Sequence, residues 1–376
     1  MRKRARGTDL ILHNSPSKTD SFNLPAVLAK TVALPVFTLI FLIHRLAFAL
    51  DLILFPQLKN VPIKKPLFIV GLPRSGTTTA HRLMASHKEL YTSMPLWELI
   101  FAPALCQKYL IWGVYQADAA IGGPVHKAVN WIQVKLAAIM DNIHPTGLTD
   151  PEEDYLGLLP FDGCFLRVLI FPFAKSTWAL GDFSSLPVAK RQKLITAYRG
   201  LVQRHLKFRG EDKRLLSKNP SFTKWVNDLA KTFPDAGFVG MYRDLEQVVP
   251  SQLSSIHLGL QIFGYSAKDP RIVKKFVTLL KHYEDGIKEH EENLGSRMLP
   301  LDFKAIADKP EKAVEALYEH FHLPKRNNLD AARLSNLLAE TKAYRSRHSY
   351  SLRDFGLEVQ DLKSPLTSPL VNSAGA

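Results

Sequence analysis

LFIVGLPRSGTT, at residues 67–78, is the clearest indication of the fold in this 376-residue chain. Its first four residues are apolar and partly β-branched and run into glycine, which is typical of a buried parallel strand. A turn bearing two glycines follows at residues 71–78, and residues 79–87 then have helical spacing with Leu83 and Met84 on the inner face. The order of strand, glycine-bearing loop and helix predicts one unit of an α/β fold.

Strands and helices continue to alternate after this unit. Apolar runs predict four further strands, at residues 90–93, 214–217, 237–242 and 298–303. Helical patterns follow them at residues 222–233, from 244 onward, and at 310–321. The region between residues 100 and 210 reads as helices and loops, which we expect to shape a substrate pocket. The sequence therefore predicts a parallel β-sheet flanked by helices, with helical insertions.

The turn at residues 71–78 has the spacing of a phosphate-binding loop but lacks its lysine. Gly71 and Gly76 are separated as in Walker loops, whereas Thr77 stands where nucleotide triphosphatases have lysine. Backbone N–H groups of such a turn, together with the N-terminus of the next helix, can surround a phosphate. A guanidinium within the loop can supply the missing positive charge. The candidate phosphate-binding residues are Arg74, Ser75, Gly76, Thr77 and Thr78.

The string RSGTT after a strand resembles the 5′-phosphosulfate loop of sulfotransferases that use 3′-phosphoadenosine-5′-phosphosulfate (PAPS), and is similar to tyrosylprotein and bacterial-type members. In these families a second motif, an arginine followed eight residues later by a serine, holds the 3′-phosphate of PAPS. This chain has Arg243 after the strand predicted at 237–242, and Ser251 lies eight residues further on. The resemblance covers roughly residues 66–357. It implies a P-loop-like sulfotransferase fold and transfer of a sulfuryl group from PAPS to a hydroxyl or amine, releasing PAP, with no metal required.

Such a reaction needs a base at the acceptor oxygen. Glu98 is the first candidate, because several Golgi and bacterial-type sulfotransferases place a catalytic glutamate at the corresponding element; its alternative role is that of a helix N-terminal glutamate. His144 is the second, because cytosolic members of the superfamily use histidine. Further along, we expect Asp150 to cap a helix and Glu153 to complete a capping box, which leaves Glu152 or Glu153 as alternative acceptor-contacting groups.

Lys218 is a candidate for contacting the transferring sulfuryl oxygens, in a clamp-like role in the transition state. It lies in the string LSKNPS at residues 216–221, which also resembles the family. Its alternative is an ordinary lysine at a strand end. Two cysteines, Cys106 and Cys164, occur in the whole chain, so neither a disulfide framework nor a cysteine-based metal site is expected.

The charge balance favours an anionic partner, because 49 Lys and Arg against 35 Asp and Glu leave a formal net charge of +14. PAPS satisfies this expectation, and nucleic acid is not expected. The acceptor stays open among small molecules, lipids and glycans, and the oligomeric state is not predicted. Two rival functions remain: a P-loop kinase, and a non-enzymatic protein that binds an anion or a membrane. The absence of the loop lysine and of a clear Walker B carboxylate opposes the kinase.

An apolar run at residues 31–55 precedes the predicted domain. His44, Arg45 and Asp51 interrupt it, which argues against a transmembrane helix. On a helix, Lys30, His44 and Asp51 form a narrow polar stripe opposite a broad apolar surface. Two placements stay open: the helix lies in a membrane interface, or it docks on the protein body.

Three regions are therefore expected. Residues 1–60 form a basic segment and an amphipathic helix, residues 61–360 the sulfotransferase domain, and residues 361–376 a flexible tail. We expect a cytoplasmic protein; peripheral membrane association through residues 31–55 and a Golgi-type lumenal location both stay open.

Overall fold

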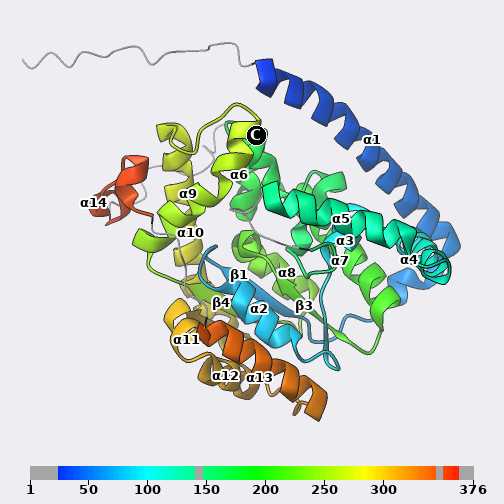
Figure 1. Ribbon diagram of the computed structural model, residues 1–376. Helices are drawn as coiled ribbons and strands as arrows, with labels where there is room; N and C mark the ends of the chain where they lie inside the picture. The colour runs from blue at the N-terminus through cyan, green and yellow to red at the C-terminus, as the bar shows by residue number, and fades with distance from the viewer. Residues whose placement is uncertain (1–23, 140–146, 344–349, 364–376) are drawn as a thin grey trace, which may run out of the picture.

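The computed structural model describes residues 24–139, 147–343 and 350–363, and its centre is a five-stranded sheet (Figure 1). All neighbouring strands are parallel, in the order β2-β3-β1-β4-β5. Each predicted strand is present: β1 (Leu67–Gly71), β2 (Tyr91–Thr92), β3 (Arg214–Lys218), β4 (Gly237–Tyr242) and β5 (Met298–Asp302). The predicted α/β fold with a parallel sheet is confirmed.

Helices cover both faces of this sheet (Figure 1). Their bounds are α1 (Leu24–Leu54), α2 (Thr77–Ala85), α3 (Leu96–Ile100), α4 (Leu105–Ala120), α5 (Pro124–Ile139), α6 (Lys175–Gly181), α7 (Val188–Arg209), α8 (Val226–Thr232), α9 (Leu245–Ile262), α10 (Pro270–Leu294), α11 (Phe303–Asp308), α12 (Pro310–His320), α13 (Asn328–Ala343) and α14 (Val359–Lys363). The helix predicted at 222–233 is instead a 3₁₀ helix (Pro220–Trp225) followed by α8, because the Thr223 hydroxyl is bonded to Gly71 and Pro220.

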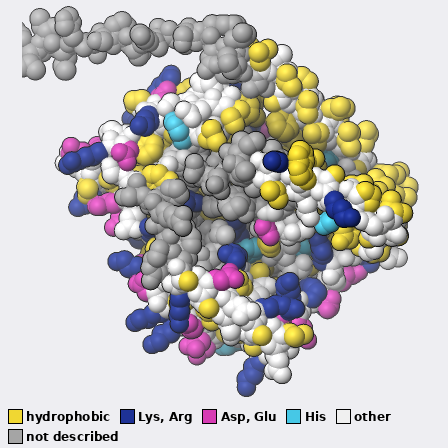
Figure 2. All heavy atoms as spheres, in the orientation of Figure 1, with side chains coloured by type: hydrophobic (Ala, Val, Ile, Leu, Met, Phe, Trp, Pro, Cys, Tyr) yellow, Lys and Arg dark blue, Asp and Glu magenta, His cyan; other side chains and the backbone are white. Residues whose placement is uncertain are grey.

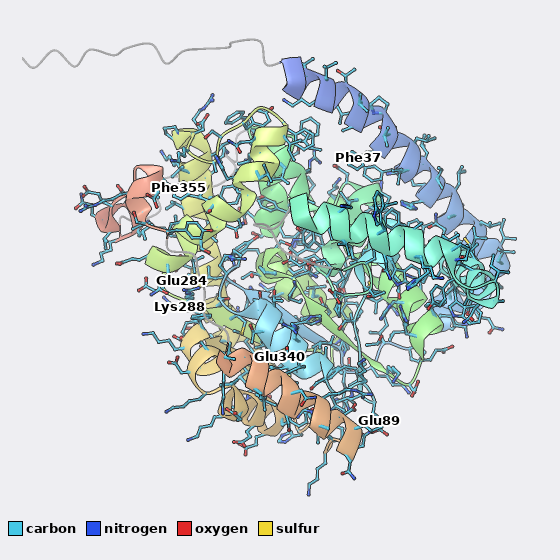
Figure 3. All side chains as sticks on the ribbon, viewed as in Figure 1. Phe37, Glu89, Glu284, Lys288, Glu340 and Phe355 are labelled. Carbon is cyan, nitrogen blue, oxygen red and sulfur yellow. The ribbon has the colours of Figure 1, made fainter. Side chains whose placement is uncertain are left out.

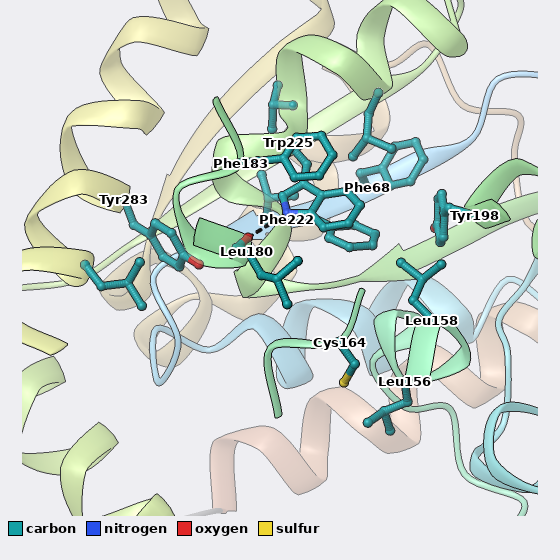
Figure 4. Close-up of a cluster of buried hydrophobic side chains, with 14 of the residues drawn as sticks. Phe68, Leu156, Leu158, Cys164, Leu180, Phe183, Tyr198, Phe222, Trp225 and Tyr283 are labelled. Atoms are coloured by element: carbon teal, nitrogen blue, oxygen red, sulfur yellow. Dashed lines mark hydrogen bonds between the residues drawn. The ribbon is translucent and has the colours of Figure 1, made fainter. Parts of the chain in front are cut away.

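The central strand β1 buries side chains on both faces, as its continuous apolar sequence predicts. Phe68 belongs to the larger core with Tyr198 of α7 and Trp225, whose indole N–H donates to the Leu180 carbonyl over 3.0 Å (Figure 4). Ile69 belongs to a second core beneath α2 and α12. The strand is thereby fixed in position from both sides.

The helix α1 crosses the outer edge of the molecule, on the opposite side from α13, as the labelled Phe37 and Glu340 show (Figure 3). Its predicted polar stripe faces the protein: Asp51 is 0% exposed and His44 is 5% exposed. Most of its large apolar residues face outward, whereas Ala47 is buried and Phe48 packs against the core. The division at residue 60 stays a prediction, and the residues beyond 363 lie outside those described.

Candidate functional site

The loop between β1 and α2 is bent by two glycines at the carboxyl end of the central strand. Gly71 has φ +112°, and a Cβ there would lie 2.1 Å from the Met241 carbonyl oxygen of β4. Gly76, which precedes α2, has φ +83°, and its Cβ would lie 3.0 Å from the Ile306 side chain. Arg74 also has a positive φ, 61°, which is uncommon for a residue with a side chain. The chain is therefore curled tightly in front of the N-terminus of α2, where backbone N–H groups and the helix dipole favour an anion.

The hydroxyl side chains of the loop have different environments. Ser75 is buried and its hydroxyl donates to the Leu72 carbonyl over 2.5 Å, so that its proton serves to hold the turn. Thr77 is buried on the first turn of α2, whereas Thr78 is exposed. Of these hydroxyls, Thr78 is the one presented at the surface.

The two predicted donor motifs meet in space. The Arg74 Nε donates to the Ser251 hydroxyl over 3.1 Å, although the two residues are 177 positions apart. The Arg243 Nη1 donates to the Arg74 carbonyl over 2.9 Å, and the Arg243 guanidinium lies 4.0 Å from the centre of the Phe303 ring. Asp244 does not pair with its neighbour but caps α9, accepting from the Glu246 N–H. The pairing of β1 with β4 causes this meeting.

The Arg243 guanidinium is thus held against the backbone of Arg74 at the end of the sheet. Burial and the positive charge of Arg74 both lower the pKa of Arg243, and Asp244 partly opposes them. An anion bound between Arg74 and Arg243 would relieve this repulsion and would accept charge-assisted hydrogen bonds. The arrangement has the chemistry of a phosphate site.

A second polar group lies at the end of β3, the neighbour of β1. Lys218, which is aligned with Ile69 of β1, places its Nζ 3.3 Å from Glu152 Oε1 and 3.8 Å from Glu153 Oε1. The side chain of Lys218 is 6% exposed and that of Glu153 is 27% exposed. Burial raises the pKa of Glu153 to about 7, although Lys218 opposes this shift; the charge of Glu152 adds to it. A carboxyl group that titrates near neutrality therefore reaches solvent beside a lysine.

The capping box predicted around this segment is wrong. Asp150 accepts from the Gly147 N–H over 2.8 Å, and Glu153 makes no side-chain cap where it precedes a 3₁₀ helix (Asp154–Phe161). The reason is that Pro151 pairs as a β-bridge with Pro95, which keeps this segment extended alongside the end of β2. Glu152 and Glu153 are thereby released from helix capping.

Asp154 fixes this segment to the end of β3. Its carboxylate accepts from the Tyr198 hydroxyl over 2.5 Å and the Ser217 hydroxyl over 2.9 Å, and also from the Asn219 amide. Burial raises the pKa of Asp154 to about 7, against the effect of these donors. The string LSKNPS therefore contributes two residues that orient the acidic segment and one, Lys218, that faces it. The sequence shows the string and the acidic run at residues 150–154 separately, and does not indicate that Asp154 contacts Ser217 and Asn219.

Glu98 is itself fully buried and lies in a different cluster, of which Arg209 is partly exposed. Its Oε2 is 2.7 Å from Lys108 Nζ and 2.8 Å from His205 Nδ1, and its Oε1 is 2.7 Å from Arg209 Nε. Burial opposes its charge, but Lys108, His205 and Arg209 together hold the pKa of Glu98 below its usual range. Burial lowers the pKa of His205, whose Nε2 is 2.9 Å from the Thr92 hydroxyl.

These contacts make Glu98 a poor proton acceptor, because both oxygens already accept hydrogen bonds and the carboxylate is strongly stabilised as an anion. Its assignment as the base stays a prediction, which this environment opposes. His144 lies outside the described residues. Glu153 is the remaining candidate, and the structure places it beside Lys218.

One group among the described residues has the spacing of metal ligands, namely His87, Glu89 and Asp330, whose ligand atoms all lie within 4.8 Å of one another. It follows the C-terminal end of α2, opposite the loop. Asp330 already accepts from the Glu89 N–H and pairs with Arg333. The group is accounted for by these contacts and does not join the loop site.

Comparisons with known proteins agree with the fold and identify a family. A family model described as the sulfotransferase family matches residues 66–155 and 181–327. The omega-hydroxy-beta-dihydromenaquinone-9 sulfotransferase Stf3 of Mycobacterium bovis is 26% identical over 270 residues, which cover 69% of this chain and 63% of that protein. Among solved structures, the sulfotransferase STF9 of Mycobacterium avium matches with a TM-score of 0.71 at 19% identity, covering 89% of this chain and 83% of that one. STF1 of Mycobacterium tuberculosis matches with a TM-score of 0.64 at 21% identity, covering 90% and 85%.

Proposed function

Because the chain belongs to the sulfotransferase family, we propose that it transfers a sulfuryl group from PAPS to a hydroxyl group of its acceptor and releases PAP. The observation that carries the donor assignment is the meeting of Arg74, Arg243 and Ser251 beside the glycine loop. PAPS has anionic groups at both its 5′ and 3′ ends, and this site offers two guanidinium groups, a hydroxyl and a helix N-terminus to hold them.

The reaction follows from the position of these groups. The acceptor oxygen attacks the sulfur, the bond from sulfur to the bridging oxygen of the 5′-phosphosulfate breaks, and the negative charge leaves on the phosphate of PAP. Arg74 and the N-terminus of α2 stabilise that departing charge. The acceptor proton passes to Glu153, whose raised pKa matches general-base catalysis near neutral pH.

Lys218 has two roles in this scheme. Its ammonium lies within 4 Å of both Glu152 and Glu153, which keeps Glu153 ionised over a wider pH range than burial alone would allow. The same positive charge stabilises the negative charge that builds on the sulfuryl oxygens in the transition state. No step requires a metal ion.

The acceptor class we favour is a lipid with a hydroxyl group. The name of the relative Stf3 places its acceptor among menaquinones, which are membrane lipids. This chain matches 63% of that relative's length, so the acceptor of Stf3 serves here as a guide to chemistry rather than as an assignment. The outward apolar surface of α1 suits a substrate that resides in a bilayer.

Transfer of labelled sulfate from PAPS to extracted membrane lipids tests this proposal, with glycans and phenols as the alternative acceptors. We expect labelled product in the lipid fraction and, in calorimetry without acceptor, binding of PAP in the absence of magnesium. Binding of ATP with magnesium in preference to PAP would identify a kinase and overturn the proposal. A protein that binds neither nucleotide would be a non-enzymatic module.

A further inference from the structure

The faces of the helix α1 are reversed relative to an ordinary surface helix, because its exposed face is the apolar one. It exposes a row of large apolar side chains along its whole length, whereas its charged side chains and His44 make contacts with the protein. The most exposed of the row, each more than half accessible, are Leu28, Val32, Leu39, Leu42, Leu46, Leu52, Ile53 and Leu54. An ordinary amphipathic helix on a water-soluble surface buries the opposite face. The exposed face of α1 is therefore better suited to an apolar environment than to water.

The polar contacts of α1 are distributed from one end to the other. Near its start, the Lys30 ammonium donates to the Tyr265 hydroxyl over 2.9 Å. In its second half, the Arg45 Nε donates to the Pro160 carbonyl over 2.9 Å, and His44 Nε2 lies 3.1 Å from the Ile100 carbonyl oxygen. These bonds hold the helix against the body along its length. Because α1 is held flat against the body of the protein, it cannot extend away from that body to cross a bilayer.

The last contact of α1 joins it to the hairpin of α4 and α5. The Asp51 carboxylate accepts from the N–H groups of Leu105 and Cys106, each over 2.8 Å, and thereby caps α4 from a different helix. The same carboxylate is 2.7 Å from Arg204 Nε of α7. The position of α4 is thus fixed to that of α1.

The hairpin continues the apolar surface of α1. Figure 2 shows hydrophobic side chains gathered along α1 and around α4. The exposed apolar residues of the hairpin, each at least 41% accessible, are Tyr109, Leu110, Trp112, Val114, Tyr115, Ile121, Val125, Trp131, Ile132 and Val134. Aromatic rings of tyrosine and tryptophan are favoured where a bilayer meets water.

The charges on this surface distinguish it from an interface with another protein. The sequences of α1, α4 and α5 hold two acidic residues, and both are buried as helix caps: Asp51 for α4 and Asp118 for α5, whose N–H groups at Val125 and His126 donate to it. The exposed lysines Lys127 and Lys135 remain on the hairpin. An apolar surface whose exposed charges are basic complements a bilayer with anionic headgroups.

We propose that α1, α4 and α5 form one membrane-docking surface, with α1 lying in the plane of an anionic lipid bilayer rather than spanning it. By length and composition Lys30–Leu54 could cross a membrane, and it is the one such segment among the described residues. The contacts at both of its ends decide for the in-plane placement. The hairpin, which the sequence pattern did not point to, inserts beside it.

Flotation of the full chain with vesicles of phosphatidylcholine and phosphatidylglycerol tests the surface. We expect Leu110→Gln/Val134→Gln to lower the partition coefficient about 10- to 100-fold, because two side chains lose their burial in the acyl region. The control Val188→Gln/Leu329→Gln replaces apolar residues of similar exposure elsewhere and should bind within about twofold of wild type. PAP affinity, measured on every variant, verifies that the site is folded.

Depth-dependent quenching by brominated lipids tests the orientation of α1. Tryptophan is introduced in turn at Val32, Leu42 and Leu52, all of which are exposed. An in-plane helix gives the three probes the same shallow depth, whereas a spanning helix places the probe at Leu42 much deeper than the other two. A deep Leu42 probe overturns the in-plane placement.

Wild-type vesicle binding by the hairpin variant would remove α4 and α5 from the surface. A wild-type chain that ignores vesicles but forms dimers, which the hairpin substitutions dissociate, would show that the surface is an interface between two copies. Vesicle binding needs neither donor nor acceptor, so a failure here and a failure of sulfate transfer are distinguishable.

Discussion

Two glutamates lie beyond the ends of neighbouring strands, and their surroundings give them opposite properties. Glu98 is wholly buried among Lys108, His205 and Arg209, which hold its pKa below the usual range. The Glu153 side chain is 27% exposed; burial of the rest of it raises its pKa to about 7, and its cationic neighbour Lys218 only partly opposes this shift. The same side chain is a fixed anion in one region and a titrating group in the other.

This contrast indicates different roles for the two glutamates, structural for Glu98 and chemical for Glu153. A carboxylate whose oxygens are both engaged stabilises the structure that surrounds it, because removing it leaves buried cations without a partner. A carboxyl group with a pKa near neutrality and access to solvent can exchange a proton during a reaction.

Glu153→Gln should lower turnover about 10²- to 10⁴-fold, because glutamine keeps the size of the side chain and removes its basicity. PAP affinity should change little. The measurement is transfer of labelled sulfate from PAPS to the lipid fraction at pH 7.5 to 8 (roughly one unit above the Glu153 pKa). If turnover survives, Glu153 is not the base.

Glu98→Gln should act on stability rather than on chemistry. Leaving Lys108 unpaired in its buried position should cost about 3–5 kcal/mol in the free energy of unfolding, and the partly exposed Arg209 should add little. Denaturant titration measures this cost, and turnover per folded molecule should stay near that of the wild type. The family resemblance implies the reverse outcome, a stable protein without turnover, which would restore Glu98 as the base.

Arg243→Ala should weaken binding of PAP about 10- to 100-fold, because a charge-assisted contact to a phosphate is lost. Binding of adenosine 5′-phosphosulfate, which lacks the 3′-phosphate, should change much less, and Ser251→Ala should show the same selectivity with a smaller loss. Calorimetry with both nucleotides measures this. Equal losses of affinity for the two nucleotides would contradict the assignment of Arg243 and Ser251 to the 3′-phosphate. That outcome would not affect the difference between Glu98 and Glu153.

The sequence predicted the donor side more fully than the acceptor side. The donor loop is a local string, and the resemblance to the family identified Arg243 and Ser251 as its partners. The pairing of β1 with β4, which the sequence did not predict, brings Arg243 to the loop. The acceptor side depends on contacts between distant segments. Nothing local distinguishes Glu98, which meets His205 from α7, from Glu153, which meets Lys218 from β3.

The orientation of α1 shows the same limit. The periodicity identified a polar stripe and a broad apolar surface but could not say which of them faces the protein. That choice depends on partners elsewhere in the chain, such as Arg204 for Asp51 and Tyr265 for Lys30. A pattern fixes the faces of a helix, and the tertiary contacts decide which face is buried.

The pH dependence of the wild type should show one acidic limb near pH 7 in kcat/KM, since the base must be ionised and the pKa of Glu153 is about 7. The sign for stability is opposite. Because the folded pKa is raised above the value of 4.5 for a free glutamate, the contribution of Glu153 to stability is present at low pH and is lost as the pH rises through about 7. A limb well below pH 4, which the environment of Glu98 would produce, would exclude Glu153.

Glu152→Gln gives the smallest and most discriminating effect. The charge of Glu152 raises the pKa of its neighbour Glu153, so its removal should move the acidic limb of kcat/KM to lower pH, by less than about one pH unit. Lys218→Met should move the same limb to higher pH, because the ammonium lowers the pKa of Glu153. Turnover above the limb should be nearly unchanged in Glu152→Gln, which makes it the matched control for Glu153→Gln. Opposite displacements of one limb by two neighbours of Glu153 would assign that limb to this carboxyl group, whereas a limb that neither substitution moves belongs to a group elsewhere in the protein.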